Sequence, residues 1–230
     1  MARHATSKVY ELKELESLST LGFRGEALAS IASVSRFSLI SRHHDSEHAW
    51  ELSLAGTSEP ISPDIKPAAR PIGTTITVRD LFFNTPARRK FLKSEKTEFG
   101  HIDEVVKRMA LVHFDKRFTL KHDDRMVYQL GPALTELERE QRIAKCFDQA
   151  FLNQALSLDV EATGLRLWGF VGLPTYSRSQ GDLQYFYVNG RIIRDKLVGH
   201  AVRQAYQDVL YGGRYPVYVL YLELDPAWVS

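Results

Sequence analysis

The sequence predicts an α+β fold, in which short strands and amphipathic helices are mixed along a chain of 230 residues. Apolar residues recur at every second position in segments such as 117–130, as expected for strands. Apolar residues recur at helical spacing over 99–114. Asn189-Gly190, between two short alternating segments, is a strong signal for a tight hairpin turn.

The composition is that of an ordinary globular protein, with 44% hydrophobic and 25% charged residues. The net charge is only +2, so any contact with nucleic acid must come from a local basic patch. The single cysteine, Cys146, excludes an intrachain disulfide and fits a reducing compartment. Because no apolar run approaches the ~20 residues of a membrane span and no signal-peptide pattern is present, we expect a cytoplasmic protein without a membrane partner.

A loop that contains Gly22 and Gly25 leads into an alanine-rich helix and organises the first half of the chain. Glycine allows unusual backbone conformations and close approach of a ligand, and a helix N-terminus attracts phosphate. Arg24 can add a charge-assisted contact. On spacing alone, an ordinary turn before a helix is the commoner interpretation. The helix is expected to bury one face, formed by Leu28, Ile31 and Ala32.

Segments 34–41 and 49–54 are predicted to form a hairpin whose turn lies near residues 43–45. The spacing of the histidines in this region matches no familiar metal-ligand pattern, and no cysteine supports one. We therefore expect a solvated turn and no metal site. These histidines are His43, His44 and His48.

β-Branched residues predict a core strand over 73–78. A helix is predicted to begin at Pro86, with Asn84 or Thr85 as its cap. The basic residues 88–90 oppose the helix dipole, which is consistent either with binding of phosphate or acidic groups or with a solvated basic face.

Residues 99–114 predict an amphipathic helix that serves as scaffold. A hairpin is expected over 117–130, and the turn signal Gly131-Pro132 that follows is our predicted domain boundary. The helix is expected to bury Phe99, Ile102, Val105, Val106, Met109 and Val112.

The second half contains a dense basic group, in which Arg191 and Arg194 follow a hairpin turn while Lys196 and Arg203 lie two helical turns apart. Such a group can follow a phosphate backbone independently of base sequence. Ordinary surface charge is an equally weighted alternative. The aromatic run 185–187 is assigned to the core rather than to base stacking, because alternation buries at least one of its sides.

Three runs, 2–8, 22–31 and 84–91, resemble motifs of the MutL family of DNA mismatch-repair ATPases and occur in that family's order. The similarity extends over nearly the whole chain. The resemblance implies the C-terminal part of a GHKL-type (Bergerat) ATPase α/β sandwich over residues 1–131. A ribosomal-protein-S5-like α/β domain, truncated at its C-terminal end, is implied over residues 132–230.

The resemblance also implies site residues. Residues of the lid over ATP would be Thr6, Ser7 and Lys8. The phosphate loop would contain Gly22, Phe23, Arg24, Gly25, Glu26, Ala27 and Leu28. Gly73 and Thr74 would lie beneath the nucleotide, and DNA would be bound by Arg191, Arg194, Lys196 and Arg203.

The function implied by the resemblance is an ATP-driven switch that couples mismatch recognition to strand processing. ATP would bind with Mg²⁺ in the full-length protein of the family. The implied partners are DNA, contacted through its backbone, the mismatch-recognition protein MutS, a downstream repair nuclease or helicase, and a second copy of the protein. The family's magnesium ligand, general base and adenine-binding run would precede Met1. We therefore expect a fragment that has no catalytic residue and hydrolyses no ATP alone.

Two other classes of protein are compatible with the sequence. A gyrase-like or heat-shock-chaperone-like ATPase of the same superfamily has a different glycine pattern, so Phe23-Arg24 and the run 84–91 argue against it. A non-enzymatic nucleic-acid-binding module would bind DNA in a salt-dependent manner without any effect of nucleotide.

Overall fold

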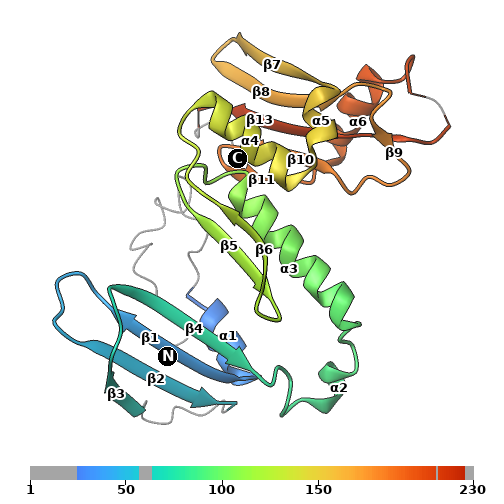
Figure 1. Cartoon of the computed structure of the whole chain (residues 1–230). Helices are drawn as coiled ribbons and strands as arrows, with labels where there is room; N and C mark the ends of the chain where they lie inside the picture. Colours follow the sequence, from blue (N-terminus) through green and yellow to red (C-terminus); the bar gives the residue numbers. More distant parts are fainter. Residues whose placement is uncertain (1–24, 57–63, 211, 226–230) are drawn as a thin grey trace. The chain divides into compact units, whose positions relative to one another are not determined.

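The computed structural model describes residues 25–56, 64–210 and 212–225. The chain divides into two compact units, residues 1–94 and 95–230 (Figure 1). Helices and strands are mixed in the described parts of both units, which confirms the predicted α+β class. The domain boundary after residue 131 stays a prediction, since a division into compact units does not define the domains of a family. None of the described helices has the length and apolar character needed to cross a membrane.

The first unit is built on a four-stranded antiparallel sheet with the strand order β3-β2-β1-β4. The hairpin predicted from the sequence is the pair β1–β2, and β1 also pairs with β4. The elements of this unit are α1 (Ala27–Ser33), β1 (Arg36–Arg42), β2 (Ala49–Ala55), β3 (Asp64–Ala68), β4 (Gly73–Arg79) and α2 (Pro86–Arg89).

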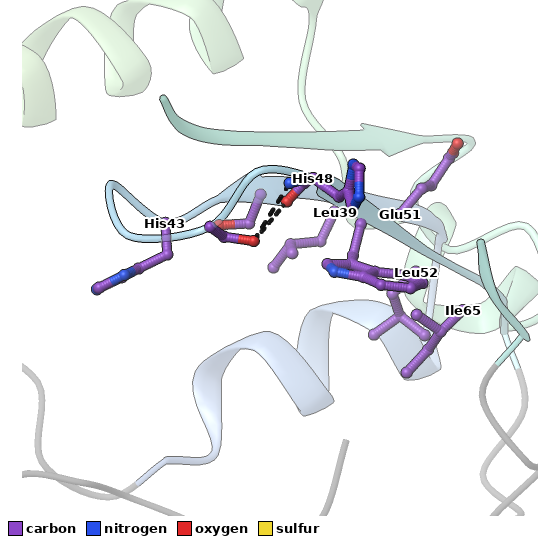
Figure 2. Close-up of a pocket in the computed structure, with 9 residues that line it drawn as sticks. Leu39, His43, His48, Glu51, Leu52 and Ile65 are labelled. Atoms are coloured by element: carbon purple, nitrogen blue, oxygen red, sulfur yellow. Dashed lines mark hydrogen bonds between the residues drawn. The ribbon is translucent and has the colours of Figure 1, made fainter. Parts of the chain in front are cut away.

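One face of this sheet is apolar. The strand register sets Phe37 beside Leu54 and Val78, and Leu39 beside Leu52 and Ile76, so their side chains share a face. The helix α1 packs against β1 and β2, and Figure 2 shows it on the side toward which Leu39, Leu52 and Ile65 point. We call this side the apolar face; its members are Phe37, Leu39, Trp50, Leu52, Leu54, Ile65, Ile76 and Val78.

The predicted buried face of α1 is only partly correct. Ala32 is buried, but Leu28 and Ile31 are 36% and 37% exposed. The helix has only seven residues, about two turns, so it can cover only a small part of the sheet. The small residue Ala32 is the one that is buried between the helix and its surroundings.

The second unit is built on a five-stranded sheet with the order β11-β10-β13-β8-β7. The strands β10 and β13 are parallel and the other neighbours are antiparallel. The hairpin β5–β6 and the two-stranded antiparallel pair β9–β12 lie outside this sheet. The elements are α3 (Glu95–Ala110), β5 (Phe118–His122), β6 (Arg125–Leu130), α4 (Glu136–Cys146), α5 (Gln149–Asn153), β7 (Ala155–Ala162), β8 (Leu165–Gly172), β9 (Ser177–Arg178), β10 (Gln184–Val188), β11 (Arg191–Ile192), α6 (Lys196–Ala205), β12 (Tyr215–Pro216) and β13 (Tyr218–Glu223).

The central strands β10 and β13 are buried on both faces of this sheet. Tyr185 and Tyr187 belong to a core that also contains Leu111, Ile143 and Phe151. The side chains that point to the other face of the sheet form a second cluster. In it, Phe186, Tyr218 and Leu220 contact Val198 and Val202 of α6. The assignment of residues 185–187 to the core is therefore confirmed.

The predicted core face of helix α3 is only partly correct, because Phe99, Val106 and Val112 are partly buried, and Val112 packs against the core. Ile102 and Val105 are 52% and 57% exposed, and Met109 is also exposed. The sheet presents tyrosine hydroxyls to α3, and hydrogen-bond acceptors of the helix and of its C-terminal end face them. The hydroxyl of Tyr185 donates to the carboxylate of Glu104 at 2.7 Å. The corresponding groups of Tyr187 and Tyr221 donate to the main-chain carbonyls of Arg108 and Leu111.

A buried arginine joins α4 to the segments around it. Arg142 is 3% exposed and lies in α4, and its guanidinium donates only to main-chain carbonyls. Four carbonyl acceptors from the end of α3 onward replace a carboxylate as its partners. These acceptors belong to Ala110 (3.1 Å), His113 (2.9 Å), Lys116 (2.8 Å) and Gly131.

Candidate functional site

The start of α1 has the backbone conformation expected of the glycine loop. Gly25 has a φ of +64°, in the left-handed region that favours glycine. Glu26 is the N-cap residue of α1, but its side chain makes no capping hydrogen bond. Ala27 and Leu28 form the first turn. The other predicted lid and loop residues lie outside the described part of the chain: Thr6, Ser7, Lys8, Gly22, Phe23 and Arg24.

The predicted pair Gly73 and Thr74 begins β4. Gly73 has a φ of +131° and pairs with Arg42 across the sheet. Thr74 pairs with Ser41, and the two hydroxyl oxygens lie 2.9 Å apart. Alternation places Thr74 on the apolar face, two positions before Ile76. Ser41 was missed by sequence reasoning, because only the strand register shows that it is the neighbour of Thr74.

A hollow of about 340 Å³ opens on the apolar face (Figure 2). Its wall includes Leu39, Leu52 and Ile65 at one end, while Ser41 and His43 lie toward the β1–β2 turn. The hollow therefore reaches Ser41, whose hydroxyl contacts that of Thr74, while Thr74 itself does not line it. The structure places α1 and Thr74 on the same face of the sheet. They lie toward opposite ends of β1, because α1 connects to its first residue and Thr74 pairs near its last.

Asn84 has a different role from the predicted cap. Its side-chain amide donates to the carbonyls of Ser33 (2.9 Å) and Gly56 (2.8 Å). Thr85 occupies the N-cap position of α2, but it makes no side-chain capping bond. Pro86 is the first residue of the helix, as predicted. The sequence missed this role of Asn84 because both acceptors are main-chain groups far away along the chain.

The basic group of the second unit lies within the β11–α6 segment. Arg191 is in β11, and Arg194 precedes α6. Lys196 and Arg203 are both in α6, and a separation of seven residues sets them on one side of the helix. All four side chains are exposed. The nearby carboxylate of Asp195 accepts from the first amides of α6, at 2.7 Å and 3.2 Å, so it is engaged in capping the helix.

Comparison with solved structures defines the class of protein. The Aquifex aeolicus MutL ATPase domain complexed with ADP is 31% identical to this chain, with a TM-score of 0.66, and the match covers 94% of this chain and 76% of that one. The B-subunit of the DNA gyrase from Myxococcus xanthus is 11% identical with a TM-score of 0.51, over 96% of this chain and 69% of that one, and so shares the fold alone. The fold is that of the GHKL ATPases.

Sequence comparison is more specific. The DNA mismatch repair protein MutL of Pseudomonas paraeruginosa is 59% identical over all 230 residues. The family model described as DNA mismatch repair protein, C-terminal domain, matches residues 143–230. The chain belongs to the MutL family. It spans 36% of the length of that Pseudomonas relative. The gyrase-like alternative is thereby set aside.

Proposed function

We propose that this chain forms the phosphate side of the nucleotide site in an ATP-dependent switch of DNA mismatch repair. The observation that carries the proposal is the left-handed Gly25 at the start of α1, on the sheet face that also holds Thr74. Support comes from the A. aeolicus relative, whose ATPase domain was solved with ADP.

The described residues fit a nucleoside triphosphate. A glycine in the left-handed region lets a phosphate approach the main chain, and the helix that follows directs amide groups and a positive dipole end toward it. The hydroxyls of Ser41 and Thr74 can donate to a phosphate or ribose oxygen. Mg²⁺ bound with ATP would neutralise phosphate charge, and we assign it no ligand among the described residues.

The test is equilibrium binding of a non-hydrolysable ATP analogue with magnesium to the chain and two variants. Thr74→Val removes one hydroxyl of the pair and should weaken binding about fivefold, the equivalent of ~1 kcal/mol for one hydrogen bond. Thr77→Val is the matched control, because Thr77 lies on the other face of β4. Equal weakening by both variants, or no binding at about 10 mM analogue, would contradict the proposal.

We also propose that the basic group of β11–α6 contacts the DNA backbone. Four exposed cations on one short segment favour such binding, as does the engagement of the Asp195 carboxylate in the helix cap. Replacing Arg191, Arg194, Lys196 and Arg203 by Ala should weaken binding to duplex DNA. It should also reduce the slope of log K against log salt by about 0.9 for each lost phosphate contact.

The control for the DNA test removes four exposed cations elsewhere in the second unit: Lys96, Lys121, Arg125 and Lys145. Both quadruple variants lose the same net charge, so only a specific contact separates them. Equal loss of affinity in both would show that net charge alone governs binding. If an ATP analogue leaves DNA affinity unchanged in a protein that binds both ligands, the non-enzymatic module would be favoured over the switch.

For the intact protein, we propose the partners and location that family membership suggests. These are a MutS-type mismatch-recognition protein, a repair nuclease or helicase, a second copy of the chain, and the cytoplasm. Pull-down of the intact protein with purified MutS on mismatched and matched duplexes tests the first of these. Retention that depends on the mismatch is the expected result, whereas equal retention on both duplexes would contradict it.

A further inference from the structure

Three potential metal ligands face one another at the turn between β1 and β2. One carboxylate oxygen of Asp45 lies 3.5 Å from Nδ1 of His43 and 3.2 Å from Nε2 of His44. The three donor atoms all lie within 4.8 Å of one another, and the two imidazole centroids are 4.1 Å apart. All three side chains are exposed, so an ion can reach them directly from solvent.

These separations match the spacing of ligands around a tetrahedral ion. Zn²⁺ binds imidazole nitrogen and carboxylate oxygen at about 2.0–2.2 Å, which sets two tetrahedral ligands roughly 3.4 Å apart. The two measured nitrogen–oxygen distances lie on either side of that value. We propose that His43, His44 and Asp45 form a surface site for a divalent transition-metal ion of the zinc type, with water completing its coordination.

Hydrogen bonds to main-chain carbonyls of the turn hold it in place, so the ligands are partly pre-organised. The amide of Ser46 donates to the carbonyl of His43 at 3.1 Å, and the guanidinium of Arg42 donates to the carbonyl of Ser46 at 3.1 Å. The amide of Asp45 also donates to Nδ1 of His43 at 3.3 Å, a long bond that an ion at this nitrogen would replace. Binding therefore requires side-chain rotations rather than refolding of the hairpin.

The ligand set selects against magnesium. Mg²⁺ prefers oxygen ligands in an octahedron, whereas two imidazoles favour zinc-type ions. This site therefore differs in chemistry from one that holds Mg²⁺ with a nucleotide. The sequence favoured a solvated turn because the histidines alone match no ligand spacing. The third ligand is the carboxylate of Asp45, which lies between these two histidines and His48 in the sequence. Only the folded turn shows that this carboxylate faces both imidazoles.

The location gives the site a structural consequence. His43 also lies at the turn end of the hollow on the apolar face (Figure 2). An ion held there would fix the turn that directly follows β1. We expect metal binding to stabilise this hairpin.

The test is calorimetric titration of the whole chain with zinc chloride at neutral pH. We expect one ion per chain, and removal of any ligand, in His43→Ala, His44→Ala or Asp45→Asn, should weaken binding at least about tenfold. The matched control is His200→Ala, which removes an exposed histidine of α6 in the other unit and should leave zinc affinity unchanged. A large excess of Mg²⁺ should not compete.

A second readout locates the ion. In imidazole nitrogen NMR spectra, resonances of His43 and His44 should shift together with the first equivalent of zinc, while those of His200 stay unchanged. Because the three ligands are exposed at a turn, their variants should keep the fold, which the unfolding transition checks. The proposal is overturned if a triple variant of the ligands binds zinc as tightly as the wild-type chain. Absence of zinc binding at about 100 µM would overturn it equally.

Discussion

Asn84 donates a hydrogen bond of 2.9 Å from its side-chain amide to the main-chain carbonyl of Ser33, the last residue of α1. The same amide donates to Gly56, just after β2. One side chain therefore connects the end of α1, the end of β2 and the start of α2. Because α1 begins at the proposed phosphate loop, Asn84 acts as a positioning residue for that helix.

Removal of this amide should destabilise the first unit. In Asn84→Ala, two carbonyls lose their donor, and we expect the free energy of unfolding to fall by about 1–3 kcal/mol. Urea denaturation followed by circular dichroism measures it. Asn153→Ala is the control, since Asn153 is exposed and its side chain only accepts a long 3.4 Å bond from Gln149. A loss in Asn84→Ala no larger than in the control would contradict the role assigned to Asn84.

A second prediction concerns the glycine beside Asn84. Gly56 has a φ of +60°, and a Cβ there would lie 2.6 Å from a ring atom of Phe83. Gly56→Ala combines backbone strain with this overlap and should cost more than about 1 kcal/mol. Gly100→Ala should have the opposite effect, because Gly100 lies within α3 with open space around it. There the gain in helix propensity is ~0.5–1 kcal/mol. Equal changes in melting temperature would refute the contrast.

The buried guanidinium of Arg142 gives a third prediction. Arg142→Met fills similar space but leaves four main-chain carbonyls without this donor. We expect a loss of at least about 3 kcal/mol, measured by urea denaturation of the second unit. Lys145→Met, on the same helix but exposed, should change stability by less than about 0.5 kcal/mol. A small loss in Arg142→Met would mean that water replaces the guanidinium without cost.

Tyr176 predicts a dependence of stability on alkaline pH. Burial raises the pKa of Tyr176 to about 12, from 10.0, and its hydroxyl donates to Asp148 at 2.6 Å. The unfolded state therefore ionises first as the pH rises above 10, so the stability from this group is complete below pH 10 and is lost as pH approaches 12. Tyr176→Phe should be less stable than wild type at neutral pH, and this difference should shrink over that window. A difference that stays constant with pH would contradict the assignment.

Local sequence signals predicted much of the fold because their causes are local. In the described residues, three two-residue hairpin turns have positive φ at both positions, which Gly, Asn and Asp favour, although Thr163 does not. Thr135 and Glu138 form a capping box at the start of α4, which their spacing of three residues favours, and the side chain of each accepts from the main-chain amide of the other. The two-residue hairpin turns with positive φ are Asp123-Asp124, Thr163-Gly164 and Asn189-Gly190.

Features that depend on distant partners were not predictable in this way. Periodicity assigned Ile102 and Val105 to the core, whereas Glu104 faces it because Tyr185, far along the chain, offers a hydroxyl. The partners of Asn84 and the pairing of Ser41 with Thr74 also arise from the fold. Gly25, in contrast, was identified from the sequence, since a position with positive φ before a helix favours glycine.

The most direct test of the central claim is to locate the bound nucleotide on this chain. Backbone amide NMR spectra recorded with increasing non-hydrolysable ATP analogue and magnesium detect binding even when it is weak. The account predicts shifts of the amides at residues 25–28 and 73–74, with the β5–β6 hairpin unchanged. Shifts confined to the basic segment 191–203, or no shifts at about 10 mM analogue, would contradict the proposed phosphate site.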